Sequence, residues 1–380
     1  MSDRIPNRRL DRRRFLAGVG IAALAGCTGS GGTRDEPRDA DGDGAANGDP
    51  SDTDEELPGT EGEPPTREPK VELADELAAF ERNARSSGVD QDGIPAIDDP
   101  AIDDAEGGDG LMEPGDVVFG VELDGKARAY PQHVLVWHEI VNDELGGTPI
   151  SVTYCPLTGT AIGYERGSTT FGVSGDLVNS NLIMYDRGTE SRWPQVLRTA
   201  IDGPLEGRAL REFPITWTTW GRWREAHPGT TAVTERTGYA RDYGNDPYGS
   251  YGPRSGYYAD GDSMFGVMNE DDRLDPKEVV IGMRGADGPI AFGKERLRSE
   301  GLIEGDVGGT PYLIAHDPTL DTGYVYRNPD DGDVSIDGEG SYAVGDERYD
   351  PDGFPLERVN AFDAMWFAWA GFYPDSALQA

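Results

Sequence analysis

The sequence predicts an α+β protein in which antiparallel sheet dominates and two degenerate tandem repeats pack into one body. Short apolar stretches rich in β-branched residues, separated by Gly, Asn and Ser, are typical of antiparallel strands. In addition, VVFG at 117–120 returns as VVIG at 279–282, and GGTP at 146–149 returns at 308–311. Both pairs are 162 positions apart (279 minus 117, 308 minus 146). Because unrelated matches would rarely share one spacing, we predict an internal duplication.

Each repeat is expected to begin with an apolar strand, a turn and a second strand. A helix should follow over 132–145 in the first repeat and 294–302 in the second, directly before the strand that contains GGTP. Further strands are predicted over 169–173 and 182–185 of the first repeat, because Gly, Ser and Asn turns separate these apolar runs.

Changes in composition divide the chain into six parts. Acidic residues, Gly and Pro with few large apolar residues predict disorder before the body, and Leu73, Leu77 and Phe80 at helical spacing predict a short helix where it begins. The parts are a twin-arginine signal with a lipoprotein box (1–27), a disordered acidic linker (28–70), a helix with an irregular segment (71–100), the first repeat with the candidate site (101–215), an aromatic-rich connector (216–275) and the second degenerate repeat (276–380).

The connector contains many Trp and Tyr residues among Gly and Pro. Its rings are expected to form a packed, loop-rich cover over the repeats. A surface on which a ligand stacks is the alternative.

The charge of the chain is extreme. The formal net charge is -37, and Lys126 is one of only four lysines among 34 basic residues. Such a surface repels itself in dilute salt and requires counterions, which favours a salt-adapted protein over an ordinary acidic one. Nucleic acid is excluded as an expected partner, because a duplex would be repelled.

The N-terminus carries an export address. Arg12-Arg13-Arg14-Phe15-Leu16 precedes a short apolar run, as in twin-arginine signals, and Leu24-Ala25-Gly26-Cys27 matches a lipoprotein box. We expect Cys27 to carry the lipid and the protein to lie on the outer face of the cytoplasmic membrane. A plain cleaved signal and an uncleaved anchor are the alternatives.

Cys155 is the candidate centre of function. Once the export segment is removed it is the last remaining thiol, and it ends an apolar strand beside Pro156. His138, on the preceding apolar helix, is the expected partner, whereas His133 lies five residues away and faces elsewhere on a helix. Inert packing of Cys155 and a core role for His138 are the alternatives.

Three chemistries would use this pair. Cys155 and His138 with Met184 would suit copper or another soft metal. A thiolate nucleophile would need His138 as base and Asn142 or Asp186 to orient its ring. Haem ligation by the thiolate is the third. Motifs typical of zinc sites, hydrolases and nucleotide binding, such as CxxC, HExxH and GxSxG, do not occur.

The two repeats differ at this candidate site. At the offset of 162, Cys155 corresponds to Asp317, His138 to Glu300 and His133 to Glu295, while Pro156 is kept as Pro318. Joint loss of the thiol and both imidazoles favours a site confined to the first repeat, and independent drift is the alternative.

Several stretches carry a family resemblance. They are ARAYP (127–131), HEIVND (138–143), TYCPLTGTA (153–161), NSNLIMYDR (179–187) and DPY (246–248). This pattern resembles domain of unknown function family 3179, as an exported, haloarchaeal-type lipoprotein member. The resemblance implies the domain and an exported location but no activity. His138, Cys155, Asn181, Met184 and Asp186 fall inside its motifs, and His133 falls outside.

The sequence therefore predicts an exported, lipid-anchored protein with a single-thiol metal or redox site. A non-catalytic binding or structural lipoprotein is the first alternative. A thiol-dependent enzyme acting on a small secreted substrate is the second.

Overall fold

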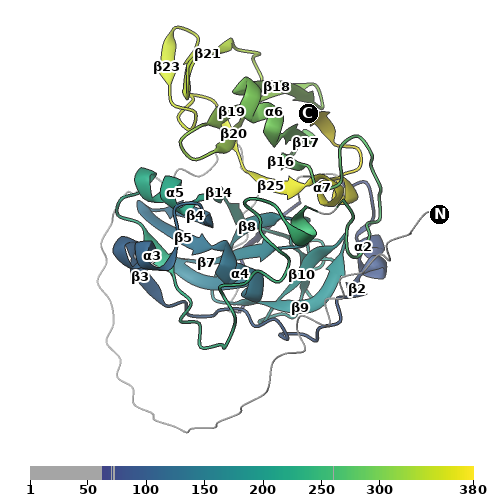
Figure 1. Cartoon of the computed structure of the whole chain (residues 1–380). Helices are drawn as coiled ribbons and strands as arrows, with labels where there is room; N and C mark the ends of the chain where they lie inside the picture. The colour runs from purple at the N-terminus through teal and green to yellow at the C-terminus, as the bar shows by residue number, and fades with distance from the viewer. Residues whose placement is uncertain (1–61, 70, 72, 260) are drawn as a thin grey trace, which may run out of the picture.

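The computed structural model describes residues 62–69, 71, 73–259 and 261–380. The predicted export signal, Cys27 and most of the acidic linker lie outside these residues. Most regular structure in the described part is β-strand, and antiparallel pairing dominates, which confirms the α+β class. Figure 1 shows the first half in blue and teal and the last hundred residues in green and yellow, as two adjoining bodies.

A run of six elements forms the centre of the first half. They are β4 (Val117–Leu123), β5 (Lys126–Pro131), α4 (Gln132–His138), β6 (Ile140–Leu145), β7 (Thr148–Cys155) and β8 (Thr160–Glu165). A second run has the same order and lengths. Its elements are β16 (Val279–Gly285), β17 (Gly288–Gly293), α6 (Lys294–Glu300), β18 (Leu302–Val307), β19 (Thr310–Asp317) and β20 (Thr322–Arg327). Each element starts and ends 162 residues after its counterpart (279 minus 117, 327 minus 165).

The strands pair in the same way in both halves. β6, β7 and β8 form an antiparallel sheet with β13 (Glu212–Phe213), and β18, β19 and β20 do so with β24 (Glu357–Val359). Beside β4 and β5 lie β14 (Thr216–Thr219), the parallel strand β15 (Thr231–Val233) and β3 (Ile102–Asp104). β25 (Ala361–Met365) and the parallel strand β26 (Ala377–Gln379) take the equivalent places beside β16 and β17. Helices α5 (Trp220–Ala226) and α7 (Trp366–Phe372) follow β14 and β25.

The halves differ in what is added to this frame. The first half has a further sheet of β11 (Arg192–Pro194), β10 (Asn181–Asp186), β9 (Phe171–Val178) and β2 (Arg85–Ser86). The second has instead a three-stranded sheet of β21 (Val334–Gly338), β22 (Ser341–Val344) and β23 (Glu347–Tyr349). The remaining elements are α2 (Leu77–Asn83), α3 (Ala105–Leu111), the 3₁₀ helix η1 (Gly256–Tyr258) and the pair β1 (Thr66–Arg67) with β12 (Ala209–Leu210).

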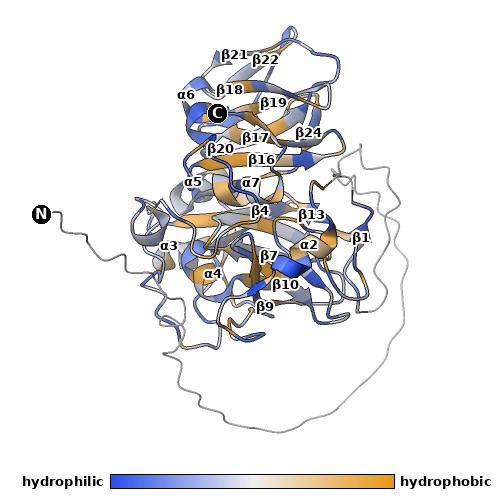
Figure 2. Cartoon of the chain, turned by 90° about the vertical axis from the view of Figure 1, so that its right-hand side faces the viewer, coloured by the Kyte–Doolittle hydropathy of each residue, from blue (hydrophilic) through white to orange (hydrophobic). Residues whose placement is uncertain are grey.

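The largest apolar cluster contains residues of both halves. Phe80, Cys155 and Trp193 belong to it, and so do Val280 and Trp366. Figure 2 shows hydrophobic strands running through the interior of the two bodies. Within the described residues, no helix has the length and apolar character needed to span a membrane.

The helix predicted over 132–145 was wrong in length, because α4 ends at His138. Glu139 takes a left-handed conformation with φ 59° and ends the helix, and the amides of the following residues enter a sheet instead. Ile140 and Val141 are β-branched and pair with Thr153 and Val152. The second copy behaves alike, since Gly301 (φ 79°) separates α6 from β18.

In both halves, a tryptophan of the helix packs directly against a glycine of the neighbouring strand. A Cβ on Gly120 would lie 2.3 Å from the Trp223 ring, and a Cβ on Gly282 would lie 2.2 Å from the Trp369 ring. Both indoles are fully buried, on α5 and α7. Each helix therefore packs on its sheet only because the strand below it has no side chain at that position.

We expect Gly120→Ala and Gly282→Ala each to lower the free energy of unfolding by about 1–3 kcal/mol, because the added methyl group overpacks a buried ring. Chemical denaturation of each variant measures this. Gly115→Ala is the control, since nothing lies within 4 Å of its Cβ. Equal stability of all three variants would contradict this account of helix packing.

Candidate functional site

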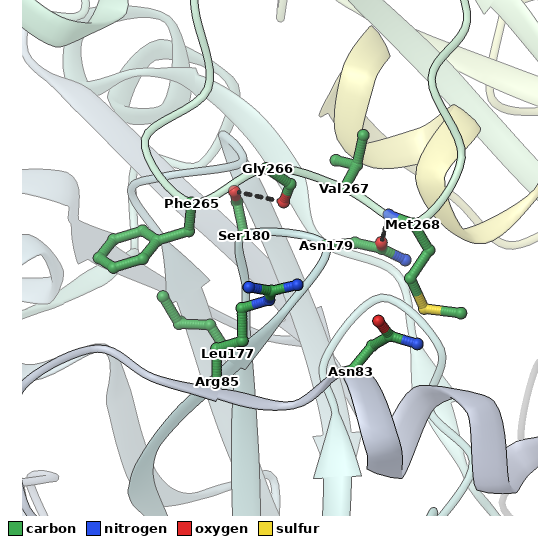
Figure 3. Close-up of a pocket in the computed structure, with 9 residues that line it drawn as sticks. All are labelled: Asn83, Arg85, Leu177, Asn179, Ser180, Phe265, Gly266, Val267 and Met268. Atoms are coloured by element: carbon green, nitrogen blue, oxygen red, sulfur yellow. Dashed lines mark hydrogen bonds between the residues drawn. The ribbon is translucent and has the colours of Figure 1, made fainter.

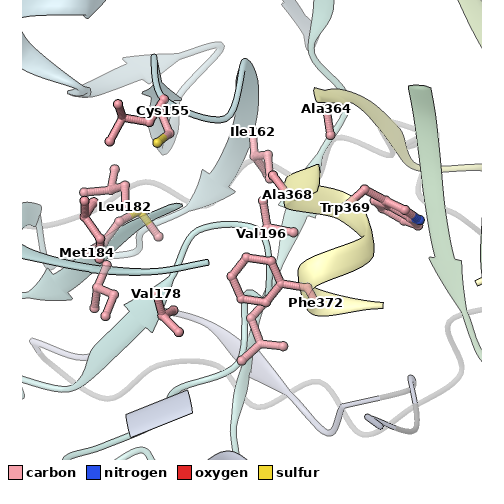
Figure 4. Close-up of a cluster of buried hydrophobic side chains, with 14 of the residues drawn as sticks. Cys155, Ile162, Val178, Leu182, Met184, Val196, Ala364, Ala368, Trp369 and Phe372 are labelled. Carbon is pink, nitrogen blue, oxygen red and sulfur yellow. The ribbon is translucent and has the colours of Figure 1, made fainter. Parts of the chain in front are cut away.

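Cys155 lies at the end of β7 in the largest apolar cluster. Its exposed fraction is 1%, and Met184 on β10, in the same cluster, is fully buried. The sulfur lies 3.8 Å from the carbonyl oxygen of Ser180. Figure 4 shows Cys155 facing Leu182 and Met184 among aliphatic side chains. Two of the three predicted metal ligands thus lie in the same apolar cluster.

His138, the third predicted ligand, is committed to other partners. Its Nδ1 lies 2.7 Å from the carbonyl oxygen of Pro95, which can only accept, so Nδ1 carries the proton. Its Nε2 lies 2.7 Å from the Tyr243 hydroxyl and accepts from it, and Tyr243 in turn accepts from Thr237. Burial lowers the pKa of His138 to about 4, although the Pro95 carbonyl opposes this shift. The ring is therefore neutral and fixed in one tautomer.

A metal held by Cys155 and His138 would require the imidazole to give up one of these hydrogen bonds. In the described part of the chain, no group of three or more His, Cys, Asp and Glu side chains is placed to hold a metal ion. The predicted soft-metal site therefore rests on the sequence alone.

Asp186 and Asn142, two further candidate residues, form hydrogen bonds that fix neighbouring segments of the chain. Asp186 is fully buried and accepts from the Thr189 amide at 2.6 Å, from the Thr189 hydroxyl at 2.7 Å and from the Trp193 indole at 3.0 Å. Asn142 donates to the Phe171 carbonyl at 2.9 Å and accepts from the Phe171 amide at 3.0 Å. Both residues therefore join neighbouring strands, and neither hydrogen-bonds with His138. His133 lies 3.3 Å from Glu235, apart from these groups.

The sequence did not predict a network of hydrogen-bonded, buried polar side chains near the end of β7, where Cys155 lies. The Asn181 amide donates to Thr158 at 3.1 Å and to Gln195 Oε1 at 2.9 Å, and Gln195 Nε2 donates to Thr153 at 2.8 Å. Thr160 donates to Gln195 at 2.6 Å. All five side chains are fully buried. They satisfy one another where β7, β8 and β10 meet, so the loop 156–159 is held rigidly.

A second buried group surrounds Asp246 in the aromatic-rich connector. Its Oδ2 accepts from Gln132 at 2.9 Å and from the Tyr258 hydroxyl at 3.1 Å, and Tyr258 lies 3.3 Å from the Tyr154 hydroxyl. Burial raises the pKa of the Asp246 carboxyl. The connector is thereby fastened to α4 and β7.

A pocket of about 240 Å³ opens between the β9–β10 hairpin, the end of α2 and the segment 265–268. Four of its lining side chains are apolar, namely Leu177, Phe265, Val267 and Met268. Figure 3 shows the Arg85 guanidinium directed into the space between the hairpin and the segment 265–268. Sequence reasoning missed this pocket because its walls come from three segments far apart in the chain.

The hairpin wall of the pocket is a two-residue turn between antiparallel strands, for which positive φ values are usual. Asn179 (φ 51°) and Ser180 (φ 59°) both occupy the left-handed region, which costs a non-glycine residue about 1 kcal/mol or more. The Asn179 side chain offsets this cost, since it donates to the Gly371 carbonyl at 2.8 Å and accepts from the Met268 amide at 2.7 Å. Ser180 donates to the Gly266 carbonyl at 3.1 Å. The hairpin therefore fixes the opposite wall of the pocket.

Residues 91–376 match the family described as "Protein of unknown function (DUF3179)". The chain belongs to this family. The match covers about three quarters of the 380 residues and includes β4 to α7. No curated protein and no solved structure matches the chain.

The DUF3179 region contains most of the pocket as well as the thiol. Asn179 and Ser180, in the NSN motif noted in the sequence, line the pocket, and Cys155 touches the other side of that turn. Asn83 and Arg85, which complete the pocket, precede the DUF3179 match. The motif signals the turn, but only the fold shows that a cavity lies beside it.

The buried neutral imidazole predicts a pH dependence. His138 has a folded pKa of about 4, below the ordinary 6.5, so the unfolded chain takes up a proton that the folded chain refuses. The neutral His138 ring therefore contributes fully to the free energy of unfolding above pH 6.5. This contribution is lost as the pH falls toward 4, and the loss amounts to about 3 kcal/mol in all.

Urea unfolding at several pH values measures this effect. The stability of the wild type should fall more steeply over this range than that of His138→Gln, which has no titrating ring. Parallel pH profiles for the two proteins would contradict the assignment.

Proposed function

We propose that this protein binds a small amphipathic molecule in the pocket beside the β9–β10 hairpin. The observation that carries the proposal is a cavity of about 240 Å³ lined by four apolar side chains, three uncharged polar side chains and one guanidinium. Small-molecule sites are concave and combine apolar side chains with placed polar groups, and this pocket has four apolar side chains beside Arg85, Asn83, Asn179 and Ser180. A pocket of this kind supports a binding role, which is part of the first alternative from the sequence, a binding lipoprotein.

Preorganisation of the pocket supports a binding role. Asn179 and Ser180 form the two-residue turn between β9 and β10, whose positive φ values are typical of such hairpins. Their side chains fasten the segment 265–268 on the opposite side of the pocket. A wall fixed before binding also lowers the entropic cost of taking up a ligand.

We further propose that the protein acts outside the cell, tethered to the membrane through Cys27. The supporting residues are the twin-arginine segment and the lipoprotein box of the sequence. The acidic stretch between Cys27 and the body would then be a spacer. Comparing the membrane fraction of cells that produce wild type with that of cells producing Cys27→Ala tests the tether.

We also propose that the body arose by duplication, with the second half as a degenerate partner that completes the fold. Six consecutive elements recur at one spacing, and the strands flanking them pair in the same register. The glycine beneath a tryptophan occurs in both halves as well. Only the first half carries the added sheet from which the pocket is built.

The thiol metal or redox site remains a second candidate. Cys155 and Met184 share one buried apolar cluster, and thiolate with thioether is a ligand combination that copper accepts. Metal analysis of the purified protein and of Cys155→Ser tests it. A metal content that the variant loses would favour this candidate, and equal, negligible content in both would remove it.

Filling the pocket should abolish binding. Met268→Trp keeps the backbone amide that Asn179 needs, while its indole occupies the cavity. We expect octan-1-ol or octanoate to bind the wild type and to bind Met268→Trp about tenfold or more weakly, as measured by calorimetric titration. Glu270→Trp, exposed and two residues away, is the matched control. Failure of both molecules to bind the wild type, or equal binding by Met268→Trp, would overturn the proposal.

A further inference from the structure

The pocket contains a single charged group, Arg85. Its backbone pairs with Leu177 between β2 and β9, and its side chain extends into the cavity. Among the described residues, the guanidinium has no hydrogen bond or ion pair. The chain has 71 acidic residues for 34 basic ones, so carboxylates to pair with an arginine are plentiful. Arg85 is an exposed residue, so its unpaired guanidinium lies at the mouth of the pocket, where an anion from outside can reach it.

The other polar side chains of the pocket are already used within the protein. The Asn179 amide bonds to the Gly371 carbonyl and the Met268 amide, and Ser180 donates to the Gly266 carbonyl. The Asn83 amide donates to the Ala79 carbonyl. A ligand with many hydroxyl or amide groups would therefore find few partners, and those groups would lose hydrogen bonds on leaving water.

The lining also discriminates by the sign of the charge. None of the nine lining residues is an Asp or Glu, so an ammonium group has no counterion in the pocket. A guanidinium offers paired N–H donors that match the two oxygens of a carboxylate. The four apolar side chains of the lining suit a hydrocarbon chain or ring.

The size of the cavity limits the ligand. Its volume of about 240 Å³ lies just below the roughly 300–1,000 Å³ typical of pockets for drug-sized molecules. The ligand should therefore be a small molecule, on the order of ten non-hydrogen atoms.

We infer that the pocket binds a small monocarboxylate with an apolar body, its carboxylate on Arg85 and its apolar part against Leu177, Phe265, Val267 and Met268. This inference rests on the proposed binding function and adds the chemical class of the ligand. The net charge of -37 opposes any anion at long range, but salt screens this repulsion while the direct contact persists.

Three probes of equal chain length separate the possibilities. Octanoate, octan-1-ol and octylamine are titrated calorimetrically into the full chain in one high-salt buffer. We expect octanoate to bind most tightly, octan-1-ol more weakly and octylamine least. In Arg85→Gln, octanoate should bind about tenfold more weakly, because an exposed charge-assisted hydrogen bond is lost, and octan-1-ol should be unaffected.

The control is Arg82→Gln, which removes an exposed arginine three residues away on α2, outside the pocket lining. It should bind octanoate like the wild type, and Arg85→Lys should keep part of the preference. Unfolding curves of each variant show that folding is intact.

The outcomes also separate this inference from the proposed function. If octan-1-ol binds as tightly as octanoate, or if Arg85→Gln keeps full octanoate affinity, the carboxylate assignment is wrong and the binding function stands. If no probe binds, both fail. Equal losses in Arg82→Gln and Arg85→Gln would mean that only general charge attraction acts, which also overturns the assignment.

Discussion

The side chain of Asn179 joins three segments that are distant in the sequence. From a turn between β9 and β10 it donates to the last turn of α7 at Gly371 and accepts from the connector at Met268. Its exposed fraction is 3%, so no water replaces these partners readily. The first half, the connector and the C-terminal helix are thereby held in one arrangement, and the pocket is the space that this arrangement leaves.

A buried ion cluster joins the two halves elsewhere. Glu212 accepts from Arg198 at 2.7 Å and from Arg284 of β16 at 2.5 Å, and all three side chains are nearly inaccessible. Removing one member of such a cluster leaves an uncompensated buried charge, which makes the pairing specific even where its net contribution to stability is small. The second half is therefore part of the same structural unit as the first and supports the pocket that lies in it.

The sequence was most informative where local pattern decides structure. The opening strands of each half and the strands after GGTP followed from apolar, β-branched runs between turns, and the spacing of 162 marked the elements that recur. It was less informative at Glu139, where a helical pattern continued beyond the true end of α4. There the pairing of Ile140 with Thr153 outweighed helical periodicity, and pairing between distant residues leaves no local signal.

Chemistry-bearing residues were located by sequence, but their roles were set by their neighbours. The residues themselves determined an acidic chain, a predicted export signal, a strand ending in Cys155 and an imidazole nearby. Only the tertiary structure decided that His138 binds Pro95 and Tyr243, that Asp186 holds a turn, and that Arg85 lies unpaired beside Leu177. The physical reason is that hydrogen bonding and burial depend on which distant segments meet, whereas periodicity and composition describe only residues close together in the chain.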